Sequence, residues 1–263
     1  MLQPLLMWVP FVFALSVLGY VSVLDFKTRR VANRVWIFAY PVGCAMTLVS
    51  VAFNFVGASV VLVSLVVSLF LGSVLFCSGF YGSADAKALI FIGLTLPAIP
   101  FTFSPPLGVS ALSIVLAVFC NSAILSLIWP IAIFVLNLKD LAKGKPLFEG
   151  IQLTLRQKVW LLFTARCIPL TKLGGLGYFP AETVVIQEEG DGKPARKLLR
   201  FVKAETNLKK YIDNLKEHSE LYQNGVFASP TIPTMIFFTL ALAIAPFGNL
   251  IFLVVSVLFG VIG

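Results

Sequence analysis

Residues 58–77 read ASVVLVSLVVSLFLGSVLFC, a run of twenty residues without a single charge. A membrane-spanning helix needs about 20 mostly apolar residues, so this run has the length and composition of one span. The chain of 263 residues shares this character, because 59% of its residues are hydrophobic and its mean hydropathy is +0.95. Soluble domains are about 45–50% apolar, so the excess predicts a membrane protein.

The hydropathy pattern predicts six such spans. They are residues 5–24, 35–53, 58–77, 88–103, 107–136 and 232–262. The last is long and carries Pro246, Gly248 and Asn249 near its middle. Proline is tolerated in membrane helices when neighbouring groups satisfy the backbone. We therefore expect one kinked helix there, in preference to a helix followed by a partial re-entry.

The basic residues predict the orientation of these spans. Of the 20 Lys and Arg residues, four lie between spans one and two, Lys87 lies between spans three and four, and fifteen lie between spans five and six. The connections around 54–57 and 104–106 carry no charge. Under the positive-inside rule the odd-numbered connections are cytoplasmic. The expected location is the cell membrane, multi-pass, with both termini outside.

A polar segment of mixed charge separates spans five and six. Within it, residues 188–194 look like a turn between strands 183–186 and 198–202, and residues 204–222 favour a charged helix. Residues 151–168 mix apolar residues with Arg156, Lys158 and Arg166. This pattern favours a helix in the cytoplasmic membrane interface, with a helix packed inside the small domain as the alternative.

The expected fold class is therefore an all-α polytopic membrane protein with six transmembrane helices and a small cytoplasmic α+β domain between helices five and six. Residues 1–136 would form membrane helices one to five, residues 137–230 the soluble domain, and residues 231–263 membrane helix six.

Two acidic residues stand apart from the rest. Ten of the 12 acids lie between Asp140 and Glu220, which leaves only Asp25 and Asp85 in the apolar parts. An ionised side chain in a bilayer costs about 2.5–3.5 kcal/mol at a helix centre, so such residues are candidates for function. Asp25 ends span one and Asp85 precedes span four, so the predicted topology places both near the cytoplasmic face.

Each acid also has a purely structural interpretation. Asp85 suits the N-terminus of a helix, where the helix dipole favours a carboxylate. Asp25 lies at a helix C-terminus, where the dipole disfavours negative charge, but an ion pair with Arg29 would compensate. The shared depth of the two acids favours a joint role over these separate ones.

Two carboxylates that share a site do not both ionise readily, so the pair holds one proton. The ionised member can accept a proton from a water molecule that attacks a peptide carbonyl. The protonated member can polarise that carbonyl and then protonate the leaving amine. Such chemistry requires no metal or organic cofactor, and none is expected.

The residues around both acids resemble a known family. Asp25 opens the stretch DFKTRRVAN that ends at Asn33, and Gly82-Ser83-Ala84-Asp85-Ala86-Lys87 precedes span four. These stretches resemble the archaeal preflagellin and type IV prepilin peptidases, which are GxGD-type intramembrane aspartic proteases. The resemblance implies that Asp25 and Asp85 are catalytic and that Gly82, Ser83, Ala84 and Lys87 belong to the motif or the substrate site. Pro230 and Pro233, in Pro-Thr-Ile-Pro, resemble a substrate-positioning motif.

The chain departs from the family pattern at Ala84, where the motif has glycine. It also lacks the paired CxxC zinc site of the bacterial enzymes, which points to the archaeal, peptidase-only branch. The resemblance implies that the substrates are class III signal peptides of archaellin or pilin precursors, cut at the cytoplasmic membrane face. Membrane lipid is a further expected partner, and nucleic acid is not.

Two other classes remain open from the residues alone. Intramembrane carboxylates serve as proton relays in transporters and channels, although those usually lie near the midplane in repeated halves. A membrane scaffold whose basic domain binds partners or anionic lipid would also suit the charge pattern, but it leaves the two acids unexplained.

Overall fold

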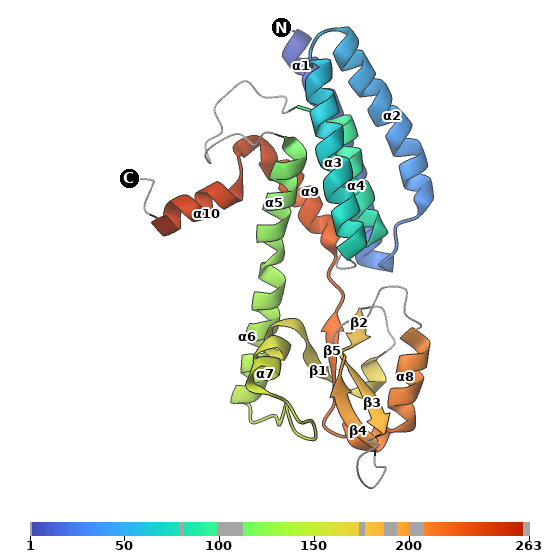
Figure 1. Ribbon diagram of the computed structural model, residues 1–263, viewed down its shortest axis with the longest axis vertical. Helices are drawn as coiled ribbons and strands as arrows, with labels where there is room; N and C mark the ends of the chain where they lie inside the picture. The colour runs from blue at the N-terminus through green and yellow to red at the C-terminus, as the bar shows by residue number, and fades with distance from the viewer. Residues whose placement is uncertain are drawn as a thin grey trace. The chain divides into compact units, whose positions relative to one another are not determined.

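The computed structural model describes residues 2–78, 82–98, 113–173, 177–186, 194–199 and 208–259. The chain divides into two compact units. Met1–Ser126 together with Pro233–Gly263 form the first, here called the helical unit, and Leu127–Ile232 form the second, here called the mixed unit. Figure 1 shows their elements.

The helical unit contains seven helices of the described chain, all of them mainly apolar. They are α1 (Leu2–Thr28), α2 (Asn33–Ala52), α3 (Ala58–Ser78), α4 (Ser83–Thr95), α5 (Ile114–Ser126), α9 (Thr234–Ile244) and α10 (Leu250–Phe259). Four stretches of the described chain are long and apolar enough to cross a membrane: Trp8–Thr28, Asn33–Ala52, Ala58–Ser78 and Ile114–Ala142. They coincide with the first, second, third and fifth predicted spans, so the chain is a membrane protein.

The fourth predicted span is shorter in the structure than in the sequence reading. Helix α4 has 13 residues and ends at Thr95, because Pro97 disfavours helical backbone just before it. A helix of that length reaches only about 20 Å, less than the bilayer core of about 30 Å. Residues 99–103 of the prediction lie outside the described residues. Six spans therefore stay a prediction.

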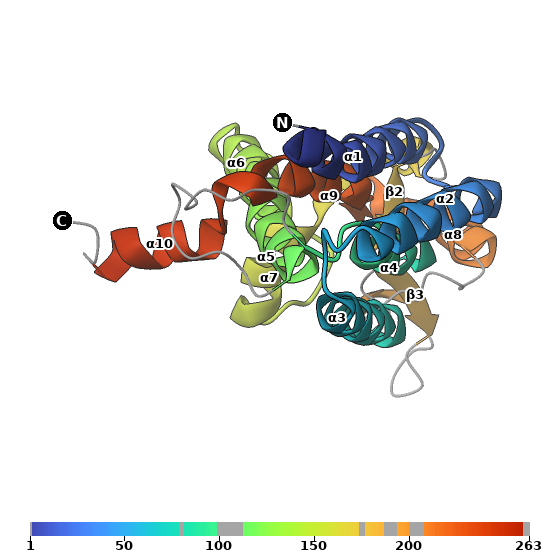
Figure 2. The same cartoon turned by 90° about the horizontal axis from the view of Figure 1, so that it is seen from above.

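Helix α4 lies at the centre of the helical unit. It contacts α1, α2, α3, α5 and α9, and Figure 2 shows it among them. Small residues permit this close packing, as is common between membrane helices. A Cβ on Gly93 would overlap the Ser68 side chain of α3, and the Ser64 hydroxyl donates to the Gly93 carbonyl at 3.0 Å. These contacts hold α4 against α3, and Asp85 lies in the first turn of α4.

The last apolar stretch corrects the prediction of one kinked helix. Helix α9 ends at Ile244, a 3-10 turn covers Ala245–Phe247, and α10 starts at Leu250. Gly248 has a φ of 126°, which glycine adopts readily and other residues rarely. The buried Asn121 of α5 holds the break, since its side chain donates to the Gly248 carbonyl and accepts from the Leu250 N–H. Beyond the break, α10 leads away from α9 (Figure 1).

The mixed unit combines helices with two small sheets. Its helices are α6 (Ile128–Ala142), α7 (Leu155–Thr164) and α8 (Leu208–Glu217), with 3-10 turns at Leu170–Lys172 and Ser219–Tyr222. Strands β1 (Arg166–Ile168), β5 (Val226–Pro230) and β2 (Tyr178–Pro180) form an antiparallel sheet in that order. Strands β3 (Glu182–Ile186) and β4 (Pro194–Leu198) form a hairpin. A small sheet region was expected, although its second hairpin strand begins four residues earlier than predicted.

Both interpretations of residues 151–168 find support in helix α7. Leu161 and Ala165 are buried in a cluster with Phe227, as a domain helix requires. On the other side Leu155 and Trp160 are 78% and 66% exposed, as a helix in the membrane interface requires. Its location in the interface stays a prediction.

Candidate active site

Both candidate aspartates contact the first turn of helix α9. The Asp85 carboxylate accepts a hydrogen bond from the Thr234 hydroxyl through Oδ1. The Asp25 Oδ2 atom lies 3.5 Å from the Met235 backbone nitrogen, whose N–H it accepts. Because Thr234 and Met235 are consecutive, the two carboxylates face the same helical turn, and they interact electrostatically. The fold thus brings together Asp25, near the end of α1, and Asp85, near the start of α4, which are 60 positions apart in the sequence.

The environment of Asp85 explains its orientation. It is 4% exposed, and its Oδ2 atom accepts the Gly82 N–H at 2.8 Å. This bond is the N-terminal cap that the structural interpretation expected. It uses only one carboxylate oxygen, and the other is directed at Thr234 of α9. The cap therefore fixes the side chain and leaves it facing a second helix.

Asp25 has a different neighbourhood from the one that the ion-pair interpretation supposed. Among the described residues no ion pair joins it to Arg29. The Arg29 N–H instead donates to the Asp25 carbonyl at 2.9 Å, and the Arg29 guanidinium lies over the Phe26 ring at 5.9 Å. The Asp25 carboxylate faces α9 and is still within electrostatic reach of Arg29.

The N-terminus of α9 suits two carboxylates. Its N-cap is Pro233, which provides no side-chain cap, so the first N–H groups of the helix are available to other acceptors. The positive end of the helix dipole also attracts negative charge. The Ser22 and Thr239 hydroxyls share a hydrogen bond of 2.7 Å, which holds α9 against α1 one turn further on.

Lys87 forms hydrogen bonds with helix α2. Its Nζ donates to the Asn33 side chain at 2.7 Å, and its carbonyl accepts from the Tyr40 hydroxyl at 3.0 Å. Both partners belong to α2, so Lys87 joins α4 to α2 near the carboxylates. Neither Asn33 nor Tyr40 was assigned a role from the sequence.

The remaining motif residues are Gly82, Ser83 and Ala84, at the start of α4, and Pro230, in strand β5. Gly82 has a φ of −74°, and a Cβ there would make only an ordinary contact of 3.4 Å with Asp85. Ser83 is exposed, and Ala84 packs partly buried against the core. Its methyl group fits the first turn of a helix. Pro230 ends strand β5 in the mixed unit.

The arrangement offers acid–base chemistry from paired carboxylates. In the described residues no three side chains of His, Cys, Asp or Glu form a group that could hold a metal ion.

Sequence reasoning missed Thr234 and the Met235 N–H. The signal for them was Pro233, since proline is common where a helix begins.

Comparison with known proteins supports a peptidase. Residues 12–131 match the type IV leader peptidase family. The resemblance found in the motifs is thereby confirmed. The chain is a peptidase. It is also similar to the preflagellin peptidase of Methanococcus voltae, with 26% identity over 246 residues, which cover 89% of this chain and 94% of that protein.

The matched part of the peptidase contains both aspartates. Residues 12–131 include Asp25, Asp85 and helices α2 to α5. Helix α9, whose first turn contacts both carboxylates, lies outside that match. The family match therefore covers both acids, and the helix that contacts their carboxylates lies beyond it.

Proposed function

We propose that this peptidase is an aspartic endopeptidase that removes class III signal peptides from archaellin or type IV pilin precursors, with Asp25 and Asp85 as its catalytic pair. One observation carries the proposal: both carboxylates contact consecutive residues of α9. A water molecule between the pair loses a proton to the ionised carboxylate and attacks the peptide carbonyl. The protonated partner stabilises the carbonyl oxygen and then protonates the departing amine.

The proposed membrane location follows from the charges beside the pair. Lys27 lies in the last turn of α1, and the connection after it carries Arg29 and Arg30. The positive-inside rule makes this end cytoplasmic. The cut would then fall at the cytoplasmic membrane face. The precursor would present a short basic segment there and keep its apolar helix in the bilayer.

Cleavage of purified precursors tests this proposal. The full chain is reconstituted in liposomes and incubated separately with an archaellin precursor and a pilin precursor. We expect one new N-terminus on at least one of them, identified by mass spectrometry of both fragments. A precursor whose basic segment is replaced by acidic residues serves as the control. Intact precursors of both kinds after prolonged incubation would refute the proposal.

Thr234 is expected to position Asp85 for this reaction. Thr234→Val removes the hydroxyl that donates to the carboxylate and keeps the size and the branching of the side chain. Hydrogen bonds to charged groups contribute about 1.5–3 kcal/mol, so kcat should fall about ten-fold or more with little change in KM. Thr234→Ser restores the hydroxyl and should restore most of kcat. Equal kcat values for the valine and serine variants would contradict this role.

A further inference from the structure

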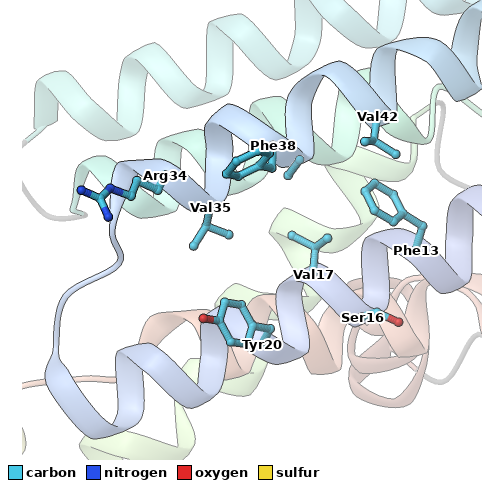
Figure 3. A pocket seen from close by; sticks show the side chains of 9 residues that line it. Phe13, Ser16, Val17, Tyr20, Arg34, Val35, Phe38 and Val42 are labelled. Carbon is cyan, nitrogen blue, oxygen red and sulfur yellow. The ribbon is translucent and has the colours of Figure 1, made fainter.

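An apolar groove runs between helices α1 and α2. Its first part is a cavity of about 550 Å³ that includes Phe13, Val17, Phe38 and Val42. Figure 3 shows Phe13 and Val17 of α1 directed toward α2, and Val35 and Val42 of α2 directed toward α1. A second cavity of about 710 Å³ lies between the same two helices and shares Val42. The two cavities are therefore parts of one groove.

The length of the groove matches the thickness of a membrane. On the α2 side its lining extends from Arg34 to Phe53, just past the end of α2, and on the α1 side from Val9 to Tyr20. At 1.5 Å per residue Arg34 and Phe53 are about 28 Å apart, and the hydrocarbon core of a bilayer is about 30 Å thick. A lipid chain crosses only one leaflet, about half of that thickness. A single occupant of the full groove is therefore a transmembrane helix.

The chemistry of the lining is also that of a helix–helix contact. Two serine hydroxyls in the groove bond back to their own helices, Ser16 to the Val12 carbonyl and Ser50 to the Met46 carbonyl. Their hydroxyl hydrogens are therefore not available to a polar ligand. Besides these serines, the polar residues of the first cavity are Tyr20 and Arg34, and both lie at the same end of the groove. An apolar helix that ends where the groove becomes polar matches this lining.

We propose that the apolar helix of the precursor binds in this α1–α2 groove. The inference rests on the proposed function, and it adds where the substrate helix lies. Asp25 is five residues beyond Tyr20 on α1, about 7.5 Å further along the helix axis. A helix seated in the groove presents its N-terminal segment at the depth of Asp25. Arg34 repels the basic part of that segment and keeps it outside the groove.

Cross-linking tests the position of the substrate helix. Cys44, Cys77, Cys120 and Cys167 are first replaced by alanine in the full chain with Asp85→Asn, which keeps the precursor uncut. Val42→Cys is then compared with Val66→Cys, a matched valine on α3 that is 58% exposed. A precursor with one cysteine in the middle of its apolar helix should form a disulfide with position 42 at least ten-fold more than with position 66.

A steric variant gives a second readout with both aspartates present. Val42→Trp fills the junction of the two cavities and should lower kcat/KM about ten-fold, mainly through KM, whereas Val66→Trp should stay within two-fold of the parent. Circular dichroism and thermal unfolding establish that both variants are folded. The cross-linking comparison uses only a small substitution and does not depend on the folding of the tryptophan variant.

The outcomes separate this inference from the proposed function. Equal cross-linking at positions 42 and 66, or unchanged kcat/KM in a folded Val42→Trp variant, overturns the groove as the substrate site while cleavage by the parent still supports the proposed function. Failure of the parent to cleave any precursor overturns the proposed function itself.

Discussion

Asp85→Asn is expected to reduce precursor cleavage by about 10²–10⁴-fold, the range that acid–base catalysis by one side chain contributes. Asparagine has nearly the same shape as aspartate. Its amide oxygen can still accept the Gly82 N–H, and its NH₂ group can donate to the Thr234 hydroxyl in place of the present bond. The fold should therefore remain, and the loss should fall on kcat.

Asp25→Asn should have a similar effect, because the proposed mechanism needs one ionised and one protonated carboxylate. The double variant should be no worse than either single variant, since residues that act as a unit are not additive. Cleavage is measured under single-turnover conditions in liposomes. Asp213→Asn on α8, an exposed aspartate in the mixed unit, is the matched control and should cleave at the parent rate. Retained cleavage in both single variants would exclude the catalytic pair.

The largest expected loss of stability is at Glu182 in the mixed unit. Glu182 is fully buried and accepts two hydrogen bonds from Arg196, at 2.8 and 2.9 Å, and one from the Phe227 N–H at 2.6 Å. Burial opposes the charge on Arg196, but the Glu182 carboxylate raises the pKa of Arg196 above its usual value. The pair thus connects β3, β4 and β5.

Glu182→Ala should destabilise the mixed unit by about 3–5 kcal/mol, because removal of one partner leaves a buried charge uncompensated. The side chain of Arg196 is only 3% exposed. Hydrogen exchange resolved by peptide should show faster exchange in β3, β4 and β5 and unchanged exchange in α3 and α4. Glu217→Ala removes an exposed acid from α8 and is the control. Equal exchange in the two variants would contradict the structural role of Glu182.

Several predictions from the sequence concern local properties, and the structure agrees with them. The uncharged runs 5–24, 35–53 and 58–77 predicted helices that α1, α2 and α3 confirm. Length and hydrophobicity decide such helices locally, because every backbone polar group in a bilayer must bond within its own helix. The sequence reading preferred one kinked helix to a break at Gly248, because the break is held by Asn121, more than a hundred residues away.

The hairpin register also shows the difference between what local sequence decides and what tertiary packing decides. The second strand was predicted at 198–202 from its apolar residues, whereas β4 is Pro194–Leu198. The pairing places Val184 opposite Arg196, which brings the guanidinium to Glu182. A buried ion pair between strands depends on tertiary packing, and the apolar pattern carries no sign of it.

By itself, the sequence determined that this protein is a membrane protein and that Asp25 and Asp85 are the two acids of its apolar parts, because charge in a bilayer is costly enough to be conspicuous. Only the tertiary structure decided that both carboxylates turn toward Thr234 and Met235. Those residues follow Asp85 by about 150 positions, and a contact over that separation depends on how α1, α4 and α9 pack. The physical reason is that side-chain direction is set by packing between helices, whereas the presence of a helix is set within it.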